Sequence, residues 1–182
     1  FRVVASSAGG TILGDDMSFV TTPESPVYMS SVIEDATPTW LEMEYNMILA
    51  NIIPATSAFT VFVNGGGNPV SNVAISGTKV QLTLTSPVIY GDAITVSYTQ
   101  PVSNPIQTPS GTKAATITNQ PVVNNTIGLP LIITTAISYI SVLSANSGGE
   151  IIDNGGGTIT GKGVCWSTNP NLTASSGSPF PS

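Results

Sequence analysis

The chain has 182 residues, of which 41% are hydrophobic and only 8% charged, so it is long enough to bury a core beneath a surface with little charge. Four Lys and Arg against ten Asp and Glu give a net charge of −6, which leaves no basic stripe for nucleic acid and disfavours anionic membranes. Histidine is absent and Cys165 is the only cysteine, which excludes an intrachain disulfide and a His/Cys metal site. Because Gly128 and Pro130 interrupt the longest apolar run, residues 127–133, we also expect no membrane insertion.

The first residues predict a β-hairpin. Residues 1–5 have the pattern of a strand, residues 7–10 that of a turn, and residues 17–21 that of a second strand ending at Pro23. A lone hairpin of this size is marginal in water, so we expect it to join a larger sheet. Residues 24–26 are a predicted linker.

Residues 27–126 predict a sandwich of about seven short strands. Apolar and polar residues alternate in three runs, which is typical of half-buried antiparallel strands. Turn sequences, among them Asn64-Gly65, Ser76-Gly77 and Gly91-Asp92, separate the runs. We expect one helical turn between residues 46 and 58 and a last strand over residues 114–118. The fold class is therefore predicted as all-β, with immunoglobulin-like antiparallel β-sandwich modules in tandem. The predicted inward-facing residues are Leu41, Met43, Tyr45, Val80, Leu82, Leu84, Ile94, Val96 and Tyr98.

The remaining residues predict half of another module. Strands are expected over residues 131–136, 144–153 and 159–168, separated by glycine-rich turns. Trp166 falls in the third of these strands, with Val164 on its side, and a buried Trp is common in the third strand of immunoglobulin-like sandwiches. Three strands cannot close a sandwich, so we interpret the chain as a piece of a longer protein.

Longer runs of residues carry a family resemblance. The middle block, with VNG, VAISGTKVQLTLTSPV, YGDAITVSYTQP, NPIQTPSG and VVNN, resembles the SwmB-type repeat of long bacterial surface and secreted proteins over about residues 27–126. The third block, with SGGEIIDNGGGTITGKGVCWSTNPNLT, is similar to the opening half of a fibronectin type III-like module of Bacteroidetes surface proteins, over residues 130–182. FRVVASSAGGTILGDDMSFVTTP, residues 1–23, resembles the closing hairpin of that same module type.

The resemblance implies three units: a C-terminal hairpin of a fibronectin III-like module (1–23), a complete SwmB-like β-sandwich (24–127), and the N-terminal half of a further fibronectin III-like module (128–182). It implies non-catalytic extracellular modules in tandem and supplies no catalytic residue. From it we expect a structural and adhesive spacer of a large secreted or cell-surface bacterial protein, with neighbouring modules of the same chain as partners. Further candidate partners are copies of the chain, joined through open sheet edges, and surface glycans or proteins.

An alternative from another class is a carbohydrate-binding module that accompanies a secreted enzyme or a phage fibre. Trp40, beside Pro38 and Thr39, is the candidate for stacking against a sugar ring, whereas most other aromatic residues are expected in the core.

Acidic residues are the remaining candidates for chemistry. Glu42 and Glu44 share one face of a strand with Cα atoms about 6.5–7 Å apart, which overlaps the spacing of glycosidase carboxylates, but a solvated outer face has the same pattern. No calcium-loop spacing occurs, and the segments around Asp92 and Asp153 have the pattern of turns. We therefore predict no catalytic, cofactor or metal residue, with calcium the one ion left open. Its candidate ligands are Asp15, Asp16, Glu34, Asp35, Asp92 and Asp153, and glycosylation sequons begin at Asn124 and Asn171.

Overall fold

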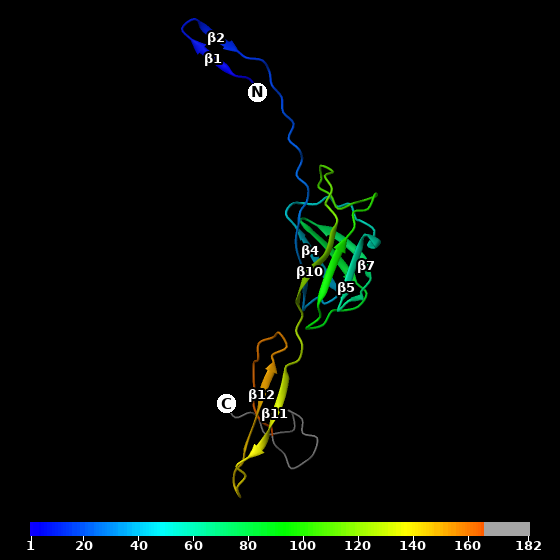
Figure 1. The fold of residues 1–182 in the computed structure, drawn as a ribbon, viewed down its shortest axis with the longest axis vertical. Helices are drawn as coiled ribbons and strands as arrows, with labels where there is room; N and C mark the ends of the chain where they lie inside the picture. The colour runs from blue at the N-terminus through cyan, green and yellow to red at the C-terminus, as the bar shows by residue number, and fades with distance from the viewer. Residues whose placement is uncertain (166–182) are drawn as a thin grey trace.

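The computed structural model describes residues 1–165, and its regular structure is almost entirely β, which confirms the all-β fold class. A two-stranded hairpin lies beyond each end of a central sandwich (Figure 1). No helix among these residues has the length and apolar character needed to cross a bilayer. The strands are β1 (Val4–Ser7), β2 (Gly10–Leu13), β3 (Tyr28–Glu34), β4 (Trp40–Tyr45), β5 (Phe59–Val63), β6 (Gly66–Gly67), β7 (Val70–Ser76), β8 (Lys79–Leu84), β9 (Ile94–Tyr98), β10 (Ile117–Asn125), β11 (Leu131–Ser138) and β12 (Asn146–Asp153), with one 3-10 helix, η1 (Thr56–Ala58).

Two facing sheets share strand β10. One sheet has the order β6-β5-β9-β10 and the other β10-β3-β4-β8-β7. The first part of β10 pairs antiparallel with β9, and its last three residues, Val123–Asn125, pair in parallel with Val32–Glu34 of β3. Pro121 lies next to this change of partner, where each part of the strand has a free edge that tolerates a residue without an N–H. One strand therefore joins both layers of the sandwich.

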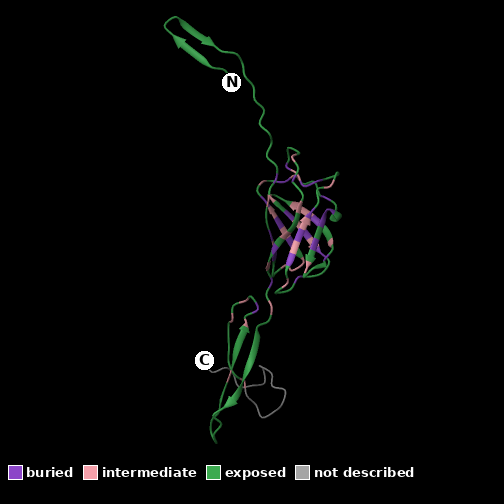
Figure 2. Ribbon diagram, viewed as in Figure 1, coloured by how far each residue is buried: buried purple, intermediate pink, exposed green. Residues whose placement is uncertain are grey.

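The core lies between the two sheets and is built by the alternating runs. All nine residues predicted to face inward are at most 4% exposed, so this prediction is confirmed (Figure 2). Leu41 lies opposite Leu82, and Met43 opposite Val80, across the β4–β8 pair. Burial of a side chain of this size contributes about 1.5–3 kcal/mol, so these strands supply much of the stability of the sandwich.

Two tight turns follow the predicted glycine signals. Asn64 and Gly65 have φ angles of 51° and 80° and join β5 to β6, as a two-residue hairpin turn with both central residues left-handed requires. Gly77, with φ of 61°, lies in the turn between β7 and β8. The predicted helical turn is η1.

The N-terminal hairpin is displaced from its predicted position. Its strands are β1 and β2 rather than residues 1–5 and 17–21, because the turn at Ala8 and Gly9 pairs Ser7 directly with Gly10. Backbone pairing continues beyond the two strands as far as Phe1, whose carbonyl oxygen accepts a hydrogen bond from the Met17 N–H at 2.8 Å. Residues 18–27 then run to the sandwich without regular secondary structure.

Three other strand boundaries differ from the predictions. The last strand of the sandwich is β10 rather than residues 114–118, and β11 and β12 each differ by two residues at one end. No strand forms over residues 159–165, where one is predicted as part of residues 159–168; Gly155 and Gly156, with φ angles of 70° and 76°, form the turn that follows β12. Val164 is 43% exposed. The predictions for Trp166 and Asn171 fall outside the described residues.

Both terminal hairpins are exposed on their two faces (Figure 2). Within residues 1–165, β1 pairs only with β2 and β11 only with β12. Apolar side chains in and beside both terminal hairpins therefore face solvent, among them Phe1, Ile12, Phe19, Ile132, Tyr139 and Leu143.

Candidate functional site

The most organised polar region of the sandwich is the end at which β10 leaves it. We call this end the C-terminal pole; it comprises loop residues 35–39, 64–65 and 85–93 and the chain from Asn124 to Leu129. The strand order places it at the ends of β3, β5, β8 and β10, and at the beginnings of β4 and β9.

Three side chains tie the loops of this pole together. The Asn64 amide donates to Asp92 Oδ1 at 2.6 Å, and Asp92 Oδ2 accepts from the Ile89 N–H at 2.9 Å. Asn124 Nδ2 donates to the carbonyl oxygens of Ile89 and Asp92, at 2.9 and 3.2 Å, while its Oδ1 accepts from the Thr126 hydroxyl at 2.7 Å. Both the nitrogen and the oxygen of the Asn124 amide are therefore hydrogen-bonded, and a glycan attached to Nδ2 would replace one of the two hydrogens that it donates.

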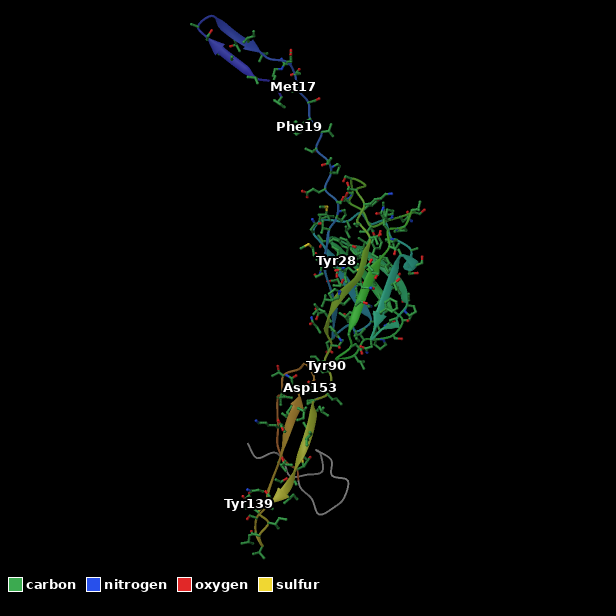
Figure 3. All side chains as sticks on the ribbon, viewed as in Figure 1. Met17, Phe19, Tyr28, Tyr90, Tyr139 and Asp153 are labelled. Atoms are coloured by element: carbon green, nitrogen blue, oxygen red, sulfur yellow. The ribbon has the colours of Figure 1, made fainter. Side chains whose placement is uncertain are left out.

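The turn that follows β12 docks on the same pole through Tyr90. The Tyr90 hydroxyl donates to Asp153 Oδ1 at 2.9 Å, and the two side chains face each other where the sandwich meets the C-terminal hairpin (Figure 3). This hydrogen bond to a carboxylate raises the pKa of Tyr90, and partial desolvation adds to the effect. The Gly128 N–H donates to the Gly155 carbonyl oxygen at 2.8 Å, which adds a backbone contact beside it.

Glycine is required at three positions of this junction. A Cβ atom on Gly128 would lie 2.9 Å from Tyr90 Cβ, and one on Gly156 would lie 2.7 Å from Tyr90 Cε2. A Cβ atom on Gly155 would lie 2.3 Å from the Gly128 carbonyl oxygen. The junction is therefore a close fit in which the backbone of one unit packs against a side chain of the other.

An open depression of about 700 Å³ lies next to this junction. Its apolar lining includes Pro38, Val88, Tyr90 and Leu129, and Asp35 is the only charged residue that lines it among residues 1–165. Asp35 Oδ1 accepts a hydrogen bond from the Ile127 N–H at 2.8 Å. The carboxylate thus holds the departing chain, and no second carboxylate among these residues lines the depression to act with it as an acid–base pair.

Trp40 begins β4 and is 44% exposed, opposite Thr83 of β8. Glu42 and Glu44 follow on the same outer face, and Lys79 of β8 forms ion pairs with both, at 3.8 Å for Glu44. Its hydrogen bond to Glu42 raises the pKa of Lys79. The two carboxylates thus share one cation on the outer face of the sheet.

The calcium candidates do not gather at one place. Asp16 pairs with Arg2 in the N-terminal hairpin, and Glu34 accepts from Asn125 at 3.1 Å. Asp153 caps its own turn by accepting from the Gly155 N–H at 2.7 Å. Among residues 1–165, no group of three or more His, Cys, Asp or Glu side chains is arranged to hold a metal ion.

Sequence reasoning does not find the junction residues. Nothing in the residue type separates Tyr90 from Tyr45 and Tyr98, which are buried in the core. Its position in a turn, directly before Gly91-Asp92, is the signal that does separate it, because an aromatic residue in a surface turn has no core to enter. The glycines of residues 155–157 have the pattern of a turn, which gives no sign of their contact with Tyr90.

Comparison with known proteins gives one family match. Residues 22–103 match the sequence model of the family SWM_repeat, described as "Putative flagellar system-associated repeat". No curated protein and no solved structure matches the chain. The match covers β3 to β9 of the sandwich and most of the block that resembles the SwmB-type repeat, and that resemblance is thereby confirmed. The central module of this chain belongs to the SwmB-type repeat family.

Proposed function

We propose that the chain is a non-catalytic spacer segment of a long bacterial cell-surface or secreted protein. In this role the sandwich holds its neighbouring modules apart and in line, and the flanking hairpins belong to fibronectin III-like modules on either side. The membership of the central module in a repeat family supports a structural role.

One observation carries the proposal: the first and last strands of the sandwich run parallel. β3 and β10 are neighbours with the same direction, so the chain enters the sandwich at the beginning of β3 and leaves it at the opposite pole, at the end of β10 (Figure 1). Modules joined in this way extend end to end rather than fold back on one another. The contact of Tyr90 with Asp153 supports the same role, because it limits bending at the point where the next unit begins.

A titration with a panel of surface polysaccharides and oligosaccharides separates the spacer from the carbohydrate-binding alternative. The full chain and its Trp40→Ala variant are followed by calorimetry and by Trp fluorescence. A spacer gives no saturable signal in either protein. Saturable binding by the full chain that is lost in Trp40→Ala would replace the spacer with a carbohydrate-binding module.

Location is tested on intact cells of the organism that makes the protein. Brief protease treatment followed by mass spectrometry should release peptides of this chain before cytoplasmic proteins appear. Release of these peptides only after lysis would refute a place on the cell surface.

A further inference from the structure

We infer that the pairing of β3 with β10 is a mechanical clamp, which sets the force needed to unfold the sandwich when its two ends are pulled apart. The inference rests on the proposed spacer role, because a spacer between a cell and an attached object carries tension. The clamp consists of Val32–Glu34 of β3 beside Val123–Asn125 of β10, in parallel register.

The direction of pulling follows from the connectivity. Tension reaches β3 through Val27, whose carbonyl oxygen accepts from the Asn46 N–H at 3.0 Å and whose N–H donates to Asn46 Oδ1 at 2.8 Å. Tension reaches β10 at Asn125, at the opposite pole. Pulling therefore slides two neighbouring strands past each other along their length. The evenly spaced hydrogen bonds between parallel strands cross that direction and share the force, whereas the bonds of a hairpin opened from its free end break one after another.

Side chains reinforce the clamp at the C-terminal pole. Asn125 Nδ2 donates to both carboxylate oxygens of Glu34, each at 3.1 Å, and so links the last residues of the paired segments. The Ile127 N–H donates to Asp35 Oδ1 at 2.8 Å, two residues beyond Asn125 and one residue beyond Glu34. These contacts must break when β10 slides along β3.

The β7–β8 hairpin lies outside this path and supplies a control. β7 is the edge strand furthest from β10 in its sheet, and a Cβ atom added to Gly77, in the turn of this hairpin, would meet no heavy atom within 4 Å. Its φ of 61° makes Gly77→Ala destabilising through the backbone alone. If the clamp ruptures first, this hairpin is still intact at the barrier, and Gly77→Ala weakens the folded state and the barrier state equally.

The test is single-molecule force spectroscopy on the full chain, held at its two termini. The terminal hairpins extend first, and the sandwich, Tyr28–Asn125, then unfolds in one step that adds roughly 300 Å of chain. At constant force, Asn125→Ala should unfold about tenfold faster, as expected when hydrogen bonds to a carboxylate are lost. Gly77→Ala should unfold at the unchanged rate although chemical denaturation shows that it is less stable. Equal acceleration by both variants would overturn the clamp.

A second pulling geometry keeps the inference testable whether or not these variants fold. In a Cys165→Ser background, handles at Val27→Cys and Thr78→Cys both attach beside the end of β4, because Asn46 bonds to Val27 and the Tyr45 N–H donates to the Thr78 carbonyl oxygen. Force applied there separates strands sideways, so the sandwich should unfold at a clearly lower force than when held at its termini. Equal forces in the two geometries would refute the clamp.

Failure of the clamp and failure of the spacer role give different results. A sandwich that unfolds at the same low force in both geometries, in a chain that binds no glycan, refutes the clamp alone. A strong clamp in a chain that binds glycan through Trp40 refutes the spacer alone.

Discussion

Two core tyrosines provide a matched test of how the sandwich is stabilised. Tyr98 of β9 is fully buried, and its hydroxyl oxygen accepts a hydrogen bond from the Ile106 N–H at 2.8 Å. Tyr45 of β4 is 2% exposed, and its hydroxyl has no hydrogen-bond partner within residues 1–165. Removal of the same oxygen atom should therefore have opposite effects at the two positions.

The magnitudes follow from what each substitution leaves behind. Tyr98→Phe leaves the N–H of Ile106, a fully buried residue, without an acceptor, which costs about 1–3 kcal/mol of unfolding free energy. Tyr45→Phe removes a hydroxyl that loses its water on folding without a replacement, so the variant should be as stable as the parent or more stable by up to about 1 kcal/mol. For a domain of this size, a change of about 1 kcal/mol corresponds to a change in Tm of about 4–8 °C.

Urea denaturation of the full chain and both variants, followed by far-UV circular dichroism, measures the two effects. The midpoint should fall for Tyr98→Phe and remain or rise for Tyr45→Phe, with the same slope in all three proteins. A loss of stability in Tyr45→Phe equal to that in Tyr98→Phe would refute the reasoning, because it would mean that the Tyr45 hydroxyl is bonded in the folded protein.

Four further predictions follow from the described residues. Burial raises the pKa of both Tyr45 and Tyr98, so the unfolded chain loses these phenol protons at a lower pH than the folded protein does. Stability should then fall as the pH rises above about 10, and Tyr45→Phe should reduce the slope measured by denaturation. Gly77→Ala should lower the unfolding free energy by about 1–2 kcal/mol, because Gly77 has a left-handed φ. Gly67 has no left-handed φ, and a Cβ atom added to it would lie within 4 Å of no heavy atom, so Gly67→Ala should change the unfolding free energy by less than about 0.5 kcal/mol in the same assay. Calcium and a chelator should leave Tm unchanged in calorimetry, since the acidic side chains of residues 1–165 are dispersed, and a rise in Tm with calcium would show a site. The exposed apolar side chains of the terminal hairpins should make the full chain self-associate in sedimentation experiments, and Ile132→Thr on β11 should weaken the association. A chain that stays monomeric at high concentration would contradict this.

Local periodicity is sufficient to predict the core but not the connection between its layers. Leu82 and Val96 are buried as predicted, because alternate residues of a strand face the same side whatever the partner strand is. The prediction misplaces β10 because Asn119, with φ of 48°, and Pro121 have the local pattern of a break. In the structure they lie within a strand that changes partner, and its parallel pairing joins Asn125 to Glu34, far away along the chain. The sequence around β10 alone cannot show this pairing, because the partner strand β3 lies far away along the chain.

The junction is unpredictable for a related reason. Tyr90 and Asp153 are 63 residues apart, and each lies in a turn whose own sequence explains its shape. The glycines at 155 and 156 satisfy a turn and also leave room for the Tyr90 ring and the backbone at Gly128, but only the first requirement is visible locally. Trp40, which residue type alone selects as a candidate, is exposed without a second aromatic residue opposite it on β8.

The polar groups of the C-terminal pole favour a connector over a binding site. A ligand site presents hydrogen-bonding groups toward a pocket, where the ligand completes them. At this pole the side chains of Asn64, Asp92 and Asn124 form their hydrogen bonds with one another or with the loop backbone instead. Asp35 accepts a hydrogen bond from the backbone of the chain that leaves the sandwich. The Tyr90 hydroxyl points outward, and its acceptor is Asp153 of the following hairpin. The sandwich therefore directs this contact to its neighbour in the chain, which is the arrangement that a spacer under tension needs at both the clamp and the junction.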